Sequence, residues 1–165
     1  MILVVAVLLT SCDQEKTAYV DTTKLIQEYK EMKDVEADFT SKSDSVKKQL
    51  DSIARGFQQE VQAYQQEMNS MSQAQRQEKE QELMQKQQRI QQQQQMQGNR
   101  LREQSDAVID SIVDKVKEYV ADYGEENGYT YIFGSNESAN IMYAKDGKDL
   151  TQEILDNLNE TYNKN

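Results

Sequence analysis

Apolar residues recur at steps of three and four over a long segment near the start of this 165-residue chain. Polar Glu36 and Ser43 occupy two of the expected positions. Such spacing keeps apolar side chains on one face of an α-helix, where a second helix can cover them. The members are Leu25, Tyr29, Met32, Phe39, Val46, Leu50, Ile53, Phe57, Val61, Tyr64, Met68 and Met71. We therefore expect one long helix over residues 23–70.

A second helical pattern follows, from about Gln73 to Tyr123, and its apolar residues are sparse at first and dense near its end. It includes the glutamine-rich stretch 85–97, which we expect to be a solvated part of the helix because glutamine is a good helix former. Small polar residues separate the two patterns, and each helix would be about 70 Å long at 1.5 Å per residue. The sequence predicts an antiparallel hairpin over residues 23–123, with its tip near 69–73.

The chain changes character after the second pattern, where Gly124 and Gly128 are expected to end the helix. Runs rich in aromatic and β-branched residues predict strands at 18–20, 129–133 and 140–144. A final amphipathic helix is expected to start near Asp149 or Thr151. The predicted fold class is mostly α with a small β part. A long helical hairpin, or coiled-coil arm, stands on a small α/β head made of residues 18–22 and 124–165.

The N-terminus has the form of a bacterial lipoprotein signal, with an apolar run at 2–9, small residues, and the only cysteine, Cys12. This pattern predicts a signal peptide over residues 1–11, a diacylglycerol on the Cys12 thiol, and a polar tether over 12–17. The run is too short to be a permanent membrane-spanning helix. No Lys or Arg precedes it, so the usual positive region is missing. The alternative is that residues 2–9 form a buried strand, although nothing else in this polar chain resembles them.

Composition argues against several classes of function. A formal net charge of −10 argues against nucleic-acid binding, because phosphates need a basic surface. The chain has no His, and its one Cys is assigned to the lipid, so the common nucleophile–base pairs and Cys/His zinc sites cannot form. We expect no catalytic residue, metal, cofactor or small-molecule substrate. Hydrophobic residues are 36% of the chain, which suits long exposed helices better than a large core.

The order strand, long hairpin, two strands and helix behind an export signal resembles the Skp/OmpH family of periplasmic chaperones. The resemblance rests on residues 19–29 at the start, and on 129–133, 140–143 and 148–155 at the end. It implies a homotrimer whose heads share a small β-core and whose arms enclose a cavity. In that cavity an unfolded outer-membrane protein would be held without ATP. It also implies a place in the bacterial cell envelope, on the periplasmic side of a membrane.

The resemblance directs attention to two sets of side chains. The candidate client-binding residues on the arm are Tyr64, Met68, Met71, Met84 and Met96. The candidate oligomerisation residues on the head are Val20, Tyr131, Phe133, Ile141 and Tyr143. Methionine adapts to partners of different shape, which suits a client surface. The alternatives are that the arm residues form the seam between two helices and that the head residues are core.

This chain departs from the best-known pattern of the family, whose arms are basic and whose chain is soluble, because it is acidic and carries a lipoprotein-like signal. A second function therefore stays open, a structural coiled-coil lipoprotein that acts as a spacer or scaffold in the envelope. A spacer would tolerate a regular, well-packed seam. The interrupted seam and the glutamine-rich stretch favour a chaperone that holds unfolded proteins.

Overall fold

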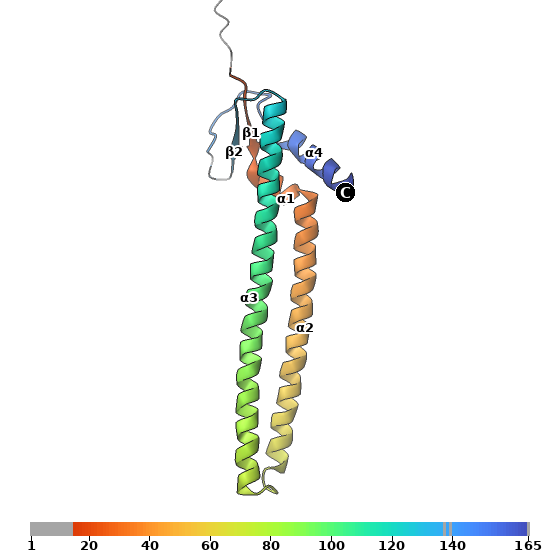
Figure 1. Cartoon of the computed structure of the whole chain (residues 1–165), viewed down its shortest axis with the longest axis vertical. Coiled ribbons are helices and arrows are strands. Elements are labelled where there is room, and N and C mark those ends of the chain that lie inside the picture. Colours follow the sequence, from red (N-terminus) through yellow and green to blue (C-terminus); the bar gives the residue numbers. More distant parts are fainter. Residues whose placement is uncertain (1–14, 137, 139, 165) are drawn as a thin grey trace, which may run out of the picture. The chain divides into compact units, whose positions relative to one another are not determined.

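The computed structural model describes residues 15–136, 138 and 140–164 (Figure 1). The predicted signal segment and Cys12 lie outside these residues. The elements are β1 (Thr17–Asp21), α1 (Thr22–Glu28), α2 (Lys30–Glu67), α3 (Gln73–Glu126), β2 (Tyr131–Ser135) and α4 (Thr151–Lys164). The predicted fold class, long paired helices with a small β part, is confirmed.

The chain divides into two compact units. One unit, here called the head, contains the residues up to Tyr29 and those from Asp114 onward. The other, here called the arm, is Lys30–Val113. Helix α3 runs through both units, and each unit is described by itself below.

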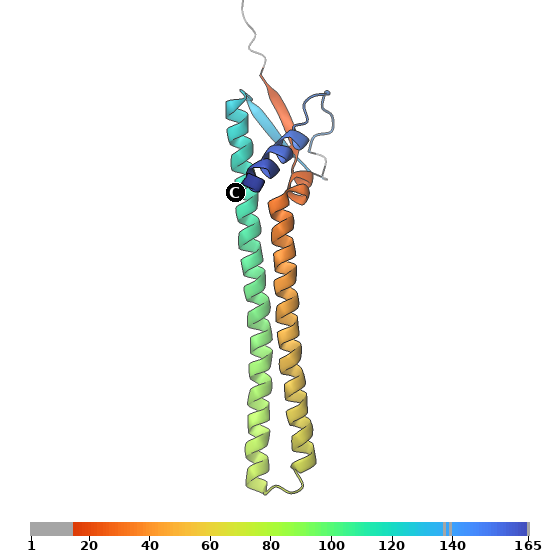
Figure 2. The same ribbon diagram turned by 90° about the vertical axis from the view of Figure 1, so that its right-hand side faces the viewer.

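The head contains a two-stranded parallel sheet, in which Thr17 pairs with Tyr131 and Asp21 with Ser135 (Figure 2). The opposite edge of β1 forms backbone hydrogen bonds with the segment before α4. The Tyr19 N–H donates to the Lys148 carbonyl at 2.9 Å, and the Tyr19 carbonyl accepts from the Leu150 N–H at 2.9 Å. Strand β1 is therefore central, whereas β2 pairs with β1 alone among the described residues.

The head core lies between the sheet and the helices. Side chains alternate along β1, so Ala18 and Val20 turn inward and are 4% and 3% exposed. Helix α4 carries apolar residues at steps of three and four, and Ile154 is fully buried. The other buried head residues are Leu25, Tyr29, Val116, Gly124, Leu150, Thr151, Leu155 and Leu158. The small core agrees with the low apolar content of the sequence.

In the arm, α2 and α3 lie side by side in both views (Figures 1 and 2). The sequence Ser72 to Gln75 begins α3 with a reciprocal pair of hydrogen bonds. The Gln75 N–H donates to the Ser72 Oγ at 3.3 Å, and the Ser72 N–H donates to the Gln75 side-chain oxygen at 2.9 Å. Such a capping box satisfies N–H groups that have no partner within the helix. The buried residues of the arm are Met32, Leu83 and Ile112.

The spacing predicted one continuous helix over residues 23–70, and this is wrong, because the structure has two helices there, α1 and α2. The first of them ends at Glu28 and the second starts at Lys30, because Tyr29 has extended backbone with ψ of 125°. The Tyr29 ring is buried and meets the Tyr162 ring edge-on, with centroids 6.1 Å apart. Burial of this ring in the head accounts for a break that periodicity alone does not show.

The predicted strand over residues 140–144 is wrong, since the described residues there are irregular. Both edges of β1 are already paired, with β2 and with the segment around Asp149, and the described residues of 140–144 do not pair with the outer edge of β2. The predicted role of Gly124 is also wrong, because α3 continues to Glu126. A Cβ on Gly124 would lie 3.3 Å from the Ile132 Cδ1, so this glycine allows β2 to approach the helix. Gly128, with φ of 66°, follows the helix end instead.

Candidate functional site

Two aromatic side chains project from one face of β2. Tyr131 and Phe133 are 55% and 50% exposed, and their rings stack with centroids 5.7 Å apart. The residue between them, Ile132, turns to the opposite face, toward Gly124. A stacked, half-exposed aromatic pair on a small head is an apolar surface that a protein partner could cover.

The segment after β2 extends this apolar surface. Met142 and Tyr143 are 89% and 86% exposed, and Ile141 is half-buried. A groove of about 690 Å³ lies between this segment, β1 and Phe133. We call the surface formed by residues 131, 133 and 141–143 the head apolar surface. Four of the five predicted oligomerisation residues belong to it, but Val20 does not, because it is buried in the core of the same head.

A second groove, of about 610 Å³, opens on the head between β2 and the end of α3. Its lining is mainly apolar and includes Val116, Val120, Ala121 and Ile132. The outer edge of β2 borders this region, and it can offer backbone donors and acceptors to another strand. The sequence did not predict either groove, because the first depends on how the segment after β2 lies against β1, and the second on how α3 meets β2.

The arm exposes two of the five predicted client-binding residues. Met84 and Met96 are 56% and 66% exposed. Tyr64, Met68 and Met71 are half-buried near the turn between α2 and α3. The five predicted client-binding residues therefore differ in exposure, since two lie on the surface and three are partly enclosed in the seam or turn.

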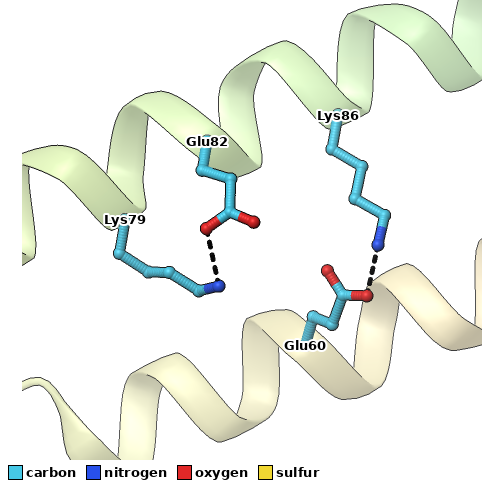
Figure 3. A network of polar contacts seen from close by, with 4 residues as sticks. All are labelled: Glu60, Lys79, Glu82 and Lys86. Carbon is cyan, nitrogen blue, oxygen red and sulfur yellow. Dashed lines mark hydrogen bonds and ion pairs between the residues drawn. The ribbon is translucent and has the colours of Figure 1, made fainter.

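A polar network lies in the half of the arm near the turn (Figure 3). Lys86 of α3 forms an ion pair with Glu60 of α2. Within α3, the Lys79 Nζ lies 2.7 Å from Glu82, and this contact lowers the pKa of the Glu82 carboxyl and raises that of Lys79. Figure 3 shows both lysines extending toward the facing helix.

A second bridge joins the helices one turn away. The Tyr64 hydroxyl donates to the Glu80 carboxylate at 2.6 Å, and this hydrogen bond raises the pKa of the phenol. Leu83, which is 9% exposed, lies in sequence between the α3 partners of the two bridges. We did not predict this network from the sequence. Its signal was present, because Lys79 and Lys86 occupy the positions before and after Leu83 in the three-and-four repeat.

The start of the described chain is held firmly against the head. The Lys16 carbonyl accepts from the Thr130 N–H at 2.8 Å, and the Lys16 Nζ donates to the Asn127 carbonyl at 2.7 Å. The same ammonium lies 3.9 Å from the centre of the Tyr129 ring. These contacts fix the point from which the predicted tether leaves the head.

No helix in residues 15–136, 138 and 140–164 is long and apolar enough to cross a bilayer. The same part of the chain holds no group of three or more His, Cys, Asp or Glu side chains placed to share a metal ion.

Residues 16–158 match the family model described as outer membrane protein (OmpH-like). This match spans most of the chain, and the protein therefore belongs to the OmpH-like family. A search of curated proteins found no match. Among solved structures, the chain is similar to a candidate outer membrane chaperone (OmpH-like) from Caulobacter crescentus CB15, with a TM-score of 0.80 and 12% sequence identity. The alignment covers 90% of this chain and 86% of that one, so the two share a fold.

Proposed function

We propose that this protein is a chaperone of the bacterial envelope that holds unfolded outer-membrane proteins without ATP. The observation that carries the proposal is the separation of its exposed apolar side chains. One group, on the head, includes Tyr131, Phe133, Met142 and Tyr143, and the other, on the arm, includes Met84 and Met96. In this proposal the head surface serves assembly and the arm surface serves clients. Membership in the OmpH-like family and the shared fold with an OmpH-like chaperone support it.

The head apolar surface is proposed to be the contact between subunits of a homotrimer. Tyr131 and Phe133 remain about half exposed in a single chain, and Tyr143 almost wholly so. The outer edge of β2, which pairs with no strand in the described part of the chain, lies in the same head. Closed cyclic symmetry would cover both features in every subunit and leave no open sheet edge.

The arm is proposed to contact clients through Met84 and Met96, with Tyr64, Met68 and Met71 near the turn. Long flexible thioether side chains fit client segments of different shape. Each contact is weak, but several contacts on each of three arms would act together and still allow release.

The protein is proposed to be held at a membrane on the periplasmic side by a lipid on Cys12. The predicted tether covers residues 12–17, and the four residues from Cys12 to Lys16 could span about 13 Å when extended. Replacement of Cys12 by Ser is expected to release the protein into the soluble periplasmic fraction. Retention of the Cys12→Ser protein in membranes would refute the lipid anchor.

A structural lipoprotein, acting as a spacer or scaffold, is the second candidate. The observation that favours it is the pair of bridges between α2 and α3, Glu60–Lys86 and Tyr64–Glu80. Bridges of this kind hold two helices in a fixed register, as a rod-like spacer needs.

The test is an aggregation assay with the mature protein that starts after Cys12. An unfolded outer-membrane β-barrel protein is diluted from urea with and without it, and light scattering is followed against the ratio of the two. We expect suppression that saturates near three chains per client. Unchanged aggregation in the presence of folded, trimeric protein would refute the chaperone proposal and favour the spacer.

Two variants separate client binding from folding. The double variant Met84→Gln/Met96→Gln is expected to suppress aggregation less well, because glutamine retains helix propensity but loses the apolar contact. Ala107→Gln, at another exposed position of α3, is the control and should behave as the parent protein. Equal activity of both variants would exclude these methionines as client contacts.

A further inference from the structure

The exposed apolar surface of the arm consists mainly of thioethers. In the described arm, the exposed large hydrophobic side chains are Met84, Met96 and Val108, at 56%, 66% and 37%. Between Gln73 and Val113, α3 contains no Cys, Trp, Tyr or His, so the two methionines are the readily oxidised side chains of this segment. The surface proposed to bind clients is therefore also the part of the helix that an oxidant can modify.

Neither of these methionines holds the two helices of the arm together. The less exposed positions of α3 recur at steps of four and three, at 79, 83, 86, 90, 93 and 97. Met84 and Met96 fall outside this series, and both lie on the exposed side of the helix. A change in the polarity of their side chains is therefore expected to leave the helix pair folded.

The other methionines of the arm are better protected. Met32 is 2% exposed, and Met68 and Met71 are half-buried. Oxidation of a thioether by a dissolved oxidant follows its exposure. The arm thus separates the methionines that pack its interior from the two that an oxidant reaches first.

We propose that Met84 and Met96 are sites of reversible oxidation to the sulfoxide, which switches off the apolar client surface of the arm. The oxidant is a peroxide, and hydrogen peroxide is the simplest. The thioether sulfur attacks one peroxide oxygen, and the S–O bond forms as the O–O bond breaks. The released hydroxide takes the proton of the transferred hydroxyl and leaves as water. Sulfur is oxidised by two electrons, and the peroxide is reduced.

The sulfoxide changes what the arm presents to a client. It replaces an apolar side chain with a polar one. A client segment that covered the new oxygen would remove its water without offering a hydrogen bond in return, so the contact weakens. Val108 would remain as the large exposed hydrophobic side chain of the described arm. Methionine sulfoxide reductases reverse the reaction. This effect on clients rests on the proposed chaperone function, whereas the modification itself does not.

The first experiment measures the oxidation of each methionine in the whole mature protein. Folded protein is treated with hydrogen peroxide, and the sulfoxide at each position is followed by peptide mass spectrometry. Each rate is divided by the rate of the same residue in urea-unfolded protein. Met84 and Met96 are expected to oxidise more than about ten times as fast as Met32, because their exposed fractions are 56% and 66% against 2%. Equal normalised rates would overturn the assignment.

The second experiment repeats the aggregation assay after peroxide treatment, and each protein is compared with its own untreated sample. The parent should lose most of its suppression. Met84→Leu/Met96→Leu, which stays apolar but has no sulfur at these positions, should keep it. The matched control is Met142→Leu, which removes a methionine that is 89% exposed on the head and should lose suppression as the parent does. Equal loss in all three proteins would refute the switch.

Two further measurements separate the switch from damage to the fold. Circular dichroism should show the same helix content before and after oxidation, and a loss of helix would refute an effect confined to the surface. Treatment of the oxidised parent with the two methionine sulfoxide reductases should restore suppression. A loss that these enzymes do not reverse would refute reversible oxidation.

The two experiments also distinguish failure of the switch from failure of the proposed function. An untreated parent that does not suppress aggregation would refute the chaperone function, and the effect on clients with it. The oxidation rates involve no client, so they support or overturn the modification sites in either case.

Discussion

Replacement of Phe133 by Ala should weaken assembly of the proposed trimer more than it weakens the fold of the head. Phe133 is 50% exposed in the single chain, so half of its surface is available to a partner. A fully enclosed aromatic side chain buries about 150–250 Å², which leaves roughly 100 Å² to be covered on assembly. At about 25 cal/mol per Å², this area contributes about 2.5 kcal/mol per subunit.

Three symmetric copies of this change sum to about 7 kcal/mol, or about five powers of ten in the association constant of a trimer. The midpoint concentration of a monomer–trimer equilibrium varies as the inverse square root of that constant. The midpoint is therefore expected to rise by roughly two to three powers of ten on replacement of Phe133.

Sedimentation velocity or mass photometry over a dilution series measures this midpoint. Circular dichroism on the same samples reports whether the helices remain. The matched control is Val108→Ala, which truncates an apolar side chain that is 37% exposed on the arm and should leave the midpoint unchanged. A trimer of Phe133→Ala that dissociates at the same concentration as the parent would show that this face of β2 is not the subunit contact.

Three further predictions concern the head. Ile154 is fully buried, so Ile154→Ala should lower the free energy of unfolding by about 3–4 kcal/mol in urea, and Ile154→Val by about 1 kcal/mol; equal effects would contradict the packing. A Cβ on Gly134 would lie 3.1 Å from the Thr22 Cγ2. Gly134→Ala should therefore cost about 1 kcal/mol, and Thr22→Ser, which removes that methyl, should restore most of it. The Tyr123 hydroxyl donates to Glu153 at 2.5 Å, which raises its pKa to about 12. The hydrogen bond from Tyr123 to Glu153 therefore stabilises the folded head fully below pH 10, and this stabilisation is lost as pH rises through about 12. The absorbance of phenolate should show one tyrosine that titrates near pH 12. Tyr123→Phe should abolish this step, and Glu153→Gln should move it to lower pH.

The arm shows how much local sequence can predict. Steps of three and four define an apolar face without reference to any distant residue, and this was enough to predict two long helices. The break between them was also readable, because Ser72 and Gln75 form a capping box when they precede a helix. Lys79 and Lys86 could be placed in the seam by the same count. Their partners could not, because the register between α2 and α3 is not a local property.

The head shows the opposite case. Residues 140–144 have the composition of a strand but are irregular, and Gly124 lies inside α3 although its residue type suggested a helix end. A strand exists only where another strand offers hydrogen bonds, and a glycine in a helix is explained only by what approaches it. The sequence by itself determined the helical class of this protein, its two long helices and their apolar faces, because these depend on neighbours in the chain. Only the tertiary structure decided which side chains stay exposed on the head and which glutamates bridge the arm, because these depend on residues far apart in sequence.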